Sequence, residues 1–252
     1  MRTVNKWDEK LLEFWYTRVG SPFDITKDLG VLRLELLKHR FQRILNKLKV
    51  KLTQESKVLS LFAGTGIDAF ALAESYGCRV VCVEKLEKLA KKGEKYARRN
   101  KLNVEFIVGD ARRLLDLIDE KDFNLALLWG NSVPHIDIYE LDSTASQVLD
   151  LLADSAPFLI EYFESTYSRE YRPVVAEFDK YPTVSIHLDF NPMKGFAERL
   201  LLVFKESGLC EYIKYPYYTW SPWIIEYVFR KNGYRDVVTF IDEGAYVTAA
   251  FR

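Results

Sequence analysis

Residues 57–68 read KVLSLFAGTGID, in which a strand-like run passes directly into a turn with two glycines. An apolar run leads into Gly64 and Gly66, and a run of small and apolar residues begins at Ile67. Glycine permits a tight turn and lets a ligand approach the backbone N–H groups, and the start of a helix adds a positive dipole end. A plain tight turn would use the same two glycines. The stretch predicts a nucleotide-type site at the carboxyl end of a buried strand.

The alternation of strand and helix patterns continues to residue 162. We expect strands at 58–62, 79–84, 104–108, 123–129 and 157–162, and helices at 67–76, 86–100, 111–118 and 141–152. Strands that alternate with helices form a parallel sheet covered on both faces. The pattern predicts a doubly wound α/β fold.

The last thirty or so residues follow a different pattern. A helix is expected between Ser221, which is a good N-cap residue, and Gly233, which ends it. Two strands follow at 237–241 and 245–251, and so short a loop between them requires an antiparallel pair. The sheet should therefore close with an antiparallel strand.

The remaining segments flank this core. Residues 1–50 are expected to form a helical cap, whose second helix packs on the core through Leu34, Leu37, Phe41, Leu45 and Leu48. Residues 164–220 are expected to form a small β-rich insertion with a hairpin of 183–190 and 198–204. The chain then reads as a single domain, 1–252, with a lid at 1–50, a cofactor-binding core at 57–162, an insertion or substrate region at 164–220 and a closing unit at 221–252.

Composition limits the functions that remain open. The 252 residues carry 36 Lys plus Arg and 36 Asp plus Glu, which argues against a basic surface over the whole molecule. Three cysteines without nearby ligand partners predict core thiols and no metal site. No signal segment and no run of membrane-spanning length are apparent, so we expect a cytoplasmic protein without a membrane partner.

Polar residues stand at the carboxyl ends of three further predicted strands. Glu84 ends one strand and can accept hydrogen bonds from ribose hydroxyls, although a surface charge is an ordinary residue there. Asp110 follows the next strand and can accept from an exocyclic amine, or else cap a helix. Trp129-Gly130-Asn131-Ser132 follows the fourth strand. Ligands bind at this edge of open parallel sheets, so the four features together indicate one site.

These residues carry a family resemblance. The motifs VLSLFAGTG, VVCVEK, FIVGDA and FNLALLWGNS, with an antiparallel last strand, resemble the class I S-adenosylmethionine-dependent methyltransferases of the small-molecule type. The resemblance implies a Rossmann-like seven-stranded sheet and S-adenosyl-L-methionine as the methyl donor. The cofactor-binding residues that it implies are Phe62, Ala63, Gly64, Thr65, Gly66, Glu84, Lys85, Asp110, Ala111, Trp129, Gly130 and Asn131.

Two positions depart from the family pattern. Ser60 stands where the first strand usually carries an acid, and Phe62 where the loop usually has its first glycine. Ser60 supplies no charge for the methionine amino group. Either another carboxylate, such as Asp68 or Asp110, replaces it, or the donor is bound less tightly.

A dinucleotide site is the main competing interpretation. Gly64-x-Gly66-x-x-Ala69 with Glu84 also fits a dinucleotide fingerprint. The closing antiparallel strands and the step to Asp110 favour the methyl donor.

Methyl transfer from a sulfonium is a direct displacement, so holding the reactants in line is the main requirement. A base is needed only for a protonated acceptor, and His135 is the candidate, although it can equally be a loop histidine without a catalytic role. Asp137 is a weaker candidate. Aromatic residues that could line an acceptor pocket, or simply pack over the sheet, are Trp15, Tyr16, Tyr167 and Tyr217.

Three functions remain open: methyl transfer to a small molecule, methyl transfer to a nucleic acid or protein, and binding of S-adenosylmethionine without catalysis. A basic stretch from Lys38 to Lys51 and the Lys/Arg-rich segment 85–101 would suit RNA or DNA, yet both read more simply as solvated helix faces. No Asn-Pro-Pro-Tyr-type motif follows the fourth strand. The sequence favours a small-molecule acceptor over nucleic acid or protein, and a non-catalytic S-adenosylmethionine-binding protein stays a third alternative.

Overall fold

The computed structural model describes Glu13, Tyr16, Ile25 and residues 28–163, 174–177, 182–205, 207–208 and 210–252. Trp15 and Tyr167, two of the residues predicted to contact the acceptor, lie outside this part of the chain. So do residues 1–12 and most of 14–27 of the expected N-terminal lid, of which Glu13, Tyr16, Ile25 and 28–50 are described.

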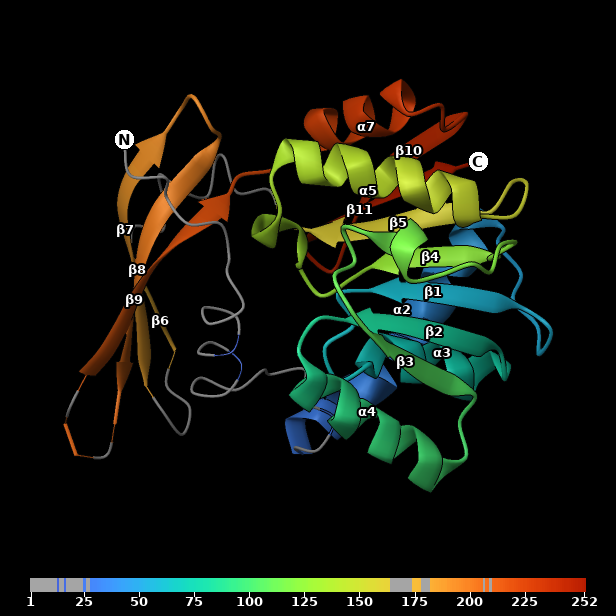
Figure 1. Cartoon of the computed structure of the whole chain (residues 1–252), viewed down its shortest axis with the longest axis horizontal. Helices are drawn as coiled ribbons and strands as arrows, with labels where there is room; N and C mark the ends of the chain where they lie inside the picture. The colour runs from blue at the N-terminus through green and yellow to red at the C-terminus, as the bar shows by residue number, and fades with distance from the viewer. Residues whose placement is uncertain are drawn as a thin grey trace.

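The core is a seven-stranded sheet in the order β10-β11-β5-β4-β1-β2-β3 (Figure 1). Its strands are β1 (Lys57–Leu61), β2 (Arg79–Glu84), β3 (Val104–Val108), β4 (Leu125–Leu128), β5 (Pro157–Tyr162), β10 (Asp236–Asp242) and β11 (Ala245–Phe251). The first five strands pair in parallel, whereas β11 runs antiparallel to both β5 and β10. The predicted doubly wound sheet with an antiparallel last strand is confirmed.

Helices cover both faces of the sheet and bury two apolar clusters. One cluster joins the sheet to α5 (Ile138–Leu151) and α7 (Pro222–Lys231), through Leu141, Val148 and Phe229 among others. The other cluster joins it to α2 (Asp28–Leu48), α3 (Ile67–Tyr76) and α4 (Glu87–Asn100). The predicted stripe on α2 packs inward, with Phe41 and Leu45 fully buried. Cys78 and Cys82 are buried thiols, as expected.

One aromatic ring fixes two helices to the sheet. Phe106 of β3 lies where a Cβ at Gly66 or at Gly93 would be, because that atom would come within 2.6 Å or 2.2 Å of the Phe106 ring. Gly93 is in the middle of α4, where glycine is otherwise unfavourable. The close approach of the Phe106 ring gives the physical reason for both glycines.

One predicted helix is wrong, and one predicted strand is too long. Residues 111–118 do not form an α-helix; a turn at Asp110 leads into a short 3₁₀ helix, η2 (Leu114–Asp116). The Asp110 carboxylate accepts hydrogen bonds from the backbone and side chain of Arg112, and this local bonding competes with helix formation. The fourth strand is also shorter than predicted, since Phe123 forms only an isolated bridge to Leu152.

The expected insertion is a separate four-stranded antiparallel sheet, the small sheet. Its strands are β6 (Val174–Glu177), β7 (Thr183–Asn191), β8 (Phe196–Phe204) and β9 (Cys210–Tyr218), in that order across the sheet. The predicted hairpin is confirmed as β7–β8. The small sheet stands beside the carboxyl-end edge of the core (Figure 1). Trp220, just after β9, donates its indole N–H to the Val133 carbonyl oxygen at 3.0 Å and so connects the end of the small sheet to the segment that follows β4.

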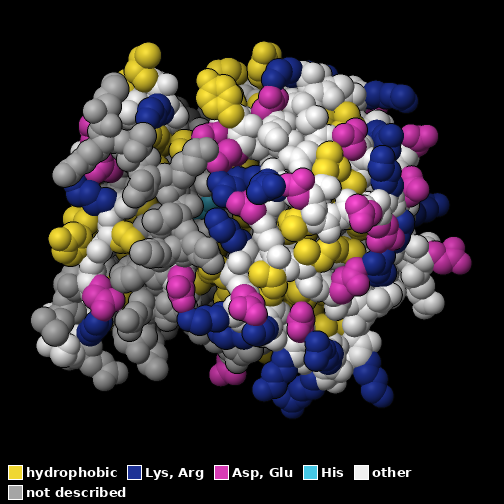
Figure 2. Space-filling model, in the orientation of Figure 1, with side chains coloured by type: hydrophobic (Ala, Val, Ile, Leu, Met, Phe, Trp, Pro, Cys, Tyr) yellow, Lys and Arg dark blue, Asp and Glu magenta, His cyan; other side chains and the backbone are white. Residues whose placement is uncertain are grey.

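Basic and acidic side chains are interspersed on the face that Figure 2 shows. The densest group of Lys and Arg lies at its lower edge, over α4, where Lys91 pairs with Glu87 and Arg98 with Glu94. In the other basic stretch, Lys38 pairs with Glu35 and Glu74. Both stretches are therefore helix faces with internal ion pairs. No helix among the described residues combines the length and apolar character that crossing a membrane would require.

Candidate functional site

A pocket opens at the carboxyl ends of β1 and β4. These strands are neighbours, with Leu61 opposite Leu128, and the chain leaves them toward opposite sides of the sheet. The pocket has two adjoining lobes that share Tyr16, Phe62 and Ser132. The acidic lobe, of about 570 Å³, includes Glu84, Lys85, Leu86, Asp110, Ala111, Arg112, His135 and Ile136. The glycine lobe, of about 480 Å³, includes Ala63, Gly64, Thr65, Ile67, Asp68, Leu89, Trp129 and Gly130.

The loop after β1 supplies an open stretch of backbone. Phe62, Gly64 and Gly66 all have positive φ, at 53°, 59° and 82°. A left-handed conformation at Phe62 is unfavourable for a residue with a side chain, and it explains why glycine suits this position. A Cβ at Gly64 would meet nothing within 4 Å. The chain thus keeps free space above the Gly64 backbone that a ligand could fill.

Glu84 sits at the end of β2 and joins the loop to the acidic lobe. One carboxylate oxygen accepts from the Gly64 N–H at 2.7 Å and the other from the Leu86 N–H at 2.8 Å. Burial raises the pKa of Glu84 to about 7, although these N–H groups favour the charged form. A carboxylate has about four lone-pair sites, so Glu84 can still accept from a ligand.

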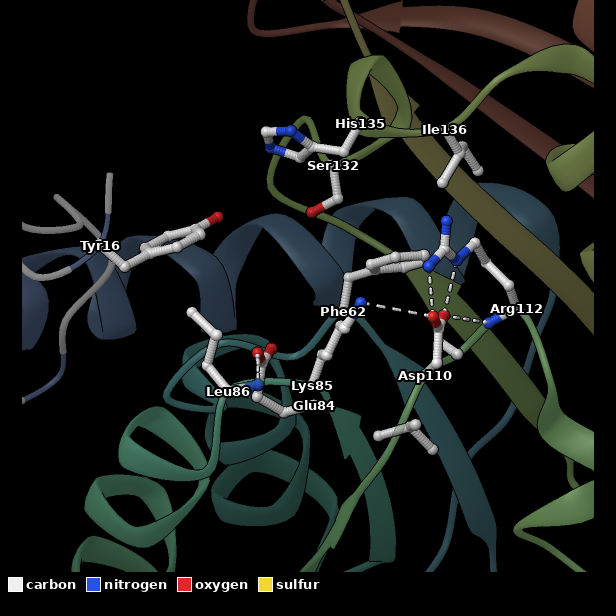
Figure 3. A pocket seen from close by; sticks show the side chains of 12 residues that line it. Tyr16, Phe62, Glu84, Lys85, Leu86, Asp110, Arg112, Ser132, His135 and Ile136 are labelled. Atoms are coloured by element: carbon white, nitrogen blue, oxygen red, sulfur yellow. Dashed lines mark hydrogen bonds and ion pairs between the residues drawn. The ribbon is translucent and has the colours of Figure 1, made fainter. Parts of the chain in front are cut away.

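Asp110 is held by neighbouring cations. Its carboxylate accepts from Nε of Arg112 at 2.7 Å and from a second Arg112 nitrogen, and Nζ of Lys85 lies 3.7 Å away. Burial by itself would raise the pKa of Asp110, but hydrogen bonds and charge from Arg112 lower it below the ordinary value. Arg112 also donates to Glu140 at 2.8 Å. Figure 3 shows Asp110 and Arg112 bonded to each other on one wall of the acidic lobe.

Ser60 and Asp68 form a buried pair beneath the glycine lobe. The Ser60 hydroxyl donates to Oδ2 of Asp68 at 2.6 Å. Both residues are buried, and Asp68 lines the lobe. Burial raises the pKa of Asp68, and the bond from Ser60 opposes that shift. The structure thus places a carboxylate beside the position where the family usually carries its first-strand acid.

The loop after β4 is fixed from below by a buried ion-pair network. Glu161, at the end of β5, accepts from the Gly130 N–H at 2.9 Å, and its other oxygen accepts from Arg40 of α2. Arg40 also donates to Asp242 at 2.7 Å and lies 5.1 Å from the Trp129 ring centre. Gly130 has φ 73°, a left-handed conformation. This network joins α2, β5 and β10 to the floor of the glycine lobe.

Trp129 adds an unsatisfied donor to the same lobe. Its indole Nε1 is buried and has no hydrogen-bond partner in the described part of the chain. A buried donor without a partner is costly, so it suits a site that is completed by a ligand.

His135 and Tyr16 lie across the acidic lobe from Glu84 and Asp110 (Figure 3). Burial lowers the pKa of His135 to about 4, so the imidazole is neutral at neutral pH. Burial, together with the charge of Glu84, raises the pKa of Tyr16. Asp137, the weaker candidate base, instead caps α5, where its side chain accepts from the Glu140 N–H at 2.8 Å.

Tyr217 of β9 connects the small sheet to the site. Its side chain is hydrogen-bonded to that of Asn131, and burial raises its pKa. Asn131 is next to Gly130, and its own side chain accepts from the Phe163 N–H at 3.4 Å. Asn131 and Tyr217 therefore lie just outside the two lobes rather than in their lining.

Most predicted site residues therefore gather in one place. Gly66 lies behind the loop, against Phe106, and does not line the pocket. Prediction missed Arg112, because residues 111–118 were expected to be helical. It also missed Glu161 and Arg40, for which the sequence carries no local signal, since they are 121 positions apart.

The comparisons with known proteins agree with this geometry. Residues 58–155 match a family model described as "Methyltransferase domain". Comparison with curated proteins found no match.

Three solved structures show the same fold. The PH0226 protein of Pyrococcus horikoshii OT3 aligns with a TM-score of 0.66 at 23% identity, covering 92% of this chain and 96% of that one. An S-adenosylmethionine-dependent methyltransferase of Clostridium acetobutylicum ATCC 824 aligns with a TM-score of 0.68 at 12% identity, covering 86% of this chain and 90% of that one. The S-adenosylmethionine-bound amino pentose methyltransferase CalS10 of Micromonospora echinaspora aligns with a TM-score of 0.63 at 12% identity, covering 88% of this chain and 95% of that one. The matched domain, the sheet order and the pocket at its switch point identify residues 58–155 as a methyltransferase domain, within a chain that has the class I S-adenosylmethionine-dependent methyltransferase fold.

Proposed function

We propose that the protein transfers the methyl group of S-adenosylmethionine to a small-molecule acceptor by in-line displacement. The observation that carries this proposal is the two-lobed pocket, whose acidic lobe suits an adenosine and whose glycine lobe suits a methionine moiety. When bound, S-adenosylmethionine supplies an electrophilic methyl group. The residues fit this cofactor, because the space above Gly64 is open and the indole N–H of Trp129 lacks a partner in the described part of the chain.

Each lobe offers groups for one part of the cofactor. Glu84 would accept from the ribose hydroxyls, and Asp110 with Ala111 would contact the adenine. Asp68, with Ser60 behind it, would hold the methionine amino group in place of a first-strand acid. The other predicted contacts that line the pocket are Phe62, Ala63, Gly64, Thr65 and Lys85, with Trp129 and Gly130 near the sulfonium. Gly66 would shape the loop from behind, and Asn131 would border the glycine lobe.

On the acceptor side, His135 would take the proton that the acceptor loses, since its neutral imidazole lies beside Ser132, which lines both lobes. Tyr16 and Tyr217 would shape the acceptor pocket, together with Trp15 and Tyr167. In this proposal the chain is one methyltransferase domain, 1–252. Residues 57–162 bind the cofactor, 1–50 and 164–220 cover the acceptor, and 221–252 close the sheet.

Two observations favour a small acceptor over a nucleic acid. The small sheet stands at the pocket edge of the core and contacts it through Tyr217 and Trp220. The two basic stretches carry internal ion pairs, and charges of both signs alternate on the surface in Figure 2. The CalS10 enzyme, named for an amino pentose acceptor, shares the fold.

Calorimetry tests the cofactor. We expect S-adenosylmethionine and S-adenosylhomocysteine to bind and nicotinamide dinucleotides not to bind. Replacing Glu84 and Asp110 together, E84Q/D110N, should weaken binding strongly, whereas D116N, which changes an exposed acid, should not. Unchanged affinity in the double variant would contradict the assignment of the pocket.

The acceptor class is tested by incubating the protein and S-adenosylmethionine with small amines, alcohols and carboxylates, and separately with total RNA. Release of S-adenosylhomocysteine measures methyl transfer to each. Turnover on a small molecule is the expected outcome. Turnover on RNA alone, with retention on immobilised RNA that falls steeply with salt, would overturn the proposal.

A further inference from the structure

One face of the small sheet carries a polar cluster near the site. Arg199 of β8 stands directly opposite His187 of β7 and Tyr215 of β9, so these three side chains share a face. Tyr217, two residues after Tyr215, points the same way. Because Tyr217 is hydrogen-bonded to Asn131, this face is the one turned toward the loop after β4.

Arg199 is held in a defined orientation. Its Nε donates to Oγ of Ser185 at 2.8 Å, and Nη2 donates to the Ser185 carbonyl oxygen at 3.2 Å. The Tyr215 hydroxyl lies 2.8 Å from the same Ser185 Oγ. These bonds use two of the five N–H donors of the guanidinium, which leaves the others available for a ligand.

The charge of Arg199 has no counter-ion in the described part of the chain. The adjacent acid, Glu198, belongs to the opposite face, where Lys214 lies 3.3 Å from it. By contrast, the buried Arg40 and the partly buried Arg112 each pair with at least two acids. A partly buried cation without a partner is costly unless a ligand supplies the opposite charge.

We propose that Arg199, oriented by Ser185 and Tyr215, binds an anionic group of the methyl acceptor, a carboxylate or a phosphate. The planar guanidinium fork matches both groups. Tyr217, on the same face, lies between Arg199 and the loop that borders the glycine lobe. The acceptor would then be bound by its anion on the small sheet while its nucleophilic atom reaches the pocket. This inference rests on the proposed function, because it names the chemical class of that acceptor.

Anion binding tests the site without any knowledge of the acceptor. Malonate and inorganic phosphate are titrated by calorimetry into the free protein and into its complex with S-adenosylhomocysteine. R199Q should weaken binding about 10- to 100-fold, in line with the strength of a charged hydrogen bond. R199K should retain part of the affinity, and the ratio of malonate to phosphate affinity identifies the anion.

K214Q is the matched control, since it removes a positive charge from the opposite face of the same sheet. Its anion affinity should equal that of the wild type. Thermal melting checks that all variants are folded. Failure of the wild type to bind either anion, or equal weakening by R199Q and K214Q, would overturn the inference.

The activity assay adds a second readout. Acceptors are offered as pairs, each acid beside its uncharged amide, and KM is measured through S-adenosylhomocysteine release. The wild type should prefer the acids, and R199Q should lose that preference. If S-adenosylmethionine does not bind at all, the proposed function fails, whereas the titration of the free protein still decides the role of Arg199.

Discussion

The hydroxyl of Ser60 donates a hydrogen bond to Oδ2 of Asp68 at 2.6 Å, across the junction of β1 and α3. Ser60 occupies the first-strand position at which related enzymes usually carry an acid. Asp68 brings a carboxylate to the same place from the first turn of the next helix. We propose that Asp68 compensates for the departure at Ser60.

This pair predicts how affinity for the methyl donor responds to mutation. D68N should weaken S-adenosylmethionine binding by about 10- to 100-fold, because it removes the charge opposite the amino group. S60A should cost less. The exchange S60D/D68S moves the carboxylate to the usual position and should restore most of the affinity. Calorimetry measures all three, and an unchanged Kd in D68N would contradict the role of Asp68.

The two loop glycines should respond differently to alanine. G64A adds a Cβ in open space, so unfolding free energy should fall only by roughly 1–2 kcal/mol from backbone strain, while the cofactor is excluded. G66A adds a clash with the Phe106 ring and should cost about 2–5 kcal/mol. Urea unfolding and calorimetry on both variants separate the effects. The prediction fails if G64A binds S-adenosylmethionine normally.

Glu84 should make stability depend on pH. Its pKa is raised from 4.5 in the unfolded chain to about 7 in the fold, so the folded state holds the proton more tightly. Stability should therefore fall as pH rises from about 4.5 to 7, by on the order of 3 kcal/mol. The glutamine introduced by E84Q does not titrate, so the variant should not lose this stability. The unfolding free energy of E84Q relative to the wild type should therefore rise as the pH rises from about 4.5 to 7. A difference independent of pH would contradict the burial of a titrating Glu84.

His135 should act through its neutral form. If it takes the proton of the acceptor, H135A should lower kcat by about 100-fold or more with a smaller effect on donor affinity. Because its pKa is lowered to about 4, this histidine should contribute no loss of activity between pH 5 and 8. The control is H39A, which changes an exposed histidine on α2. An acid limb near pH 6.5 that disappears in H135A would show that His135 titrates normally.

The network below Gly130 should stabilise the site. E161Q leaves the buried Arg40 without one partner and should cost about 3–5 kcal/mol of unfolding free energy. The control is R43Q. Arg43 is half-exposed and pairs with Asp242, which also pairs with Arg40, so this change should lower the unfolding free energy by less than about 1 kcal/mol. Donor affinity should fall in E161Q, because Gly130 loses a charged acceptor. Equal effects in the two variants, measured by urea unfolding, would show that Glu161 does not position the loop.

The sequence was sufficient for the parts of the fold that depend on local pattern. Apolar periodicity gave the parallel strands and most helices, and the short loop at 242–244 required the antiparallel closing pair. Glycines marked the turn after β1, and the acid at the end of β2 is where it was expected. The predicted 111–118 helix was wrong because the Asp110 carboxylate accepts hydrogen bonds from the backbone N–H and the side chain of Arg112, and these bonds compete with helix formation.

Tertiary structure decided the contacts between segments that are distant in the chain. Arg40 meets Asp242 across 202 positions, Glu161 reaches Gly130, and Tyr217 of the small sheet reaches Asn131. Such contacts depend on strand order and on how α2 and the small sheet pack, and no periodicity in the sequence encodes them. Local pattern was thus enough to predict the methyltransferase domain and to place the glycine turn and Glu84 at one edge of the sheet. The fold was needed to bring Arg40 to Glu161 and Arg199 to Ser185, because burial and charge pairing act between neighbours in space.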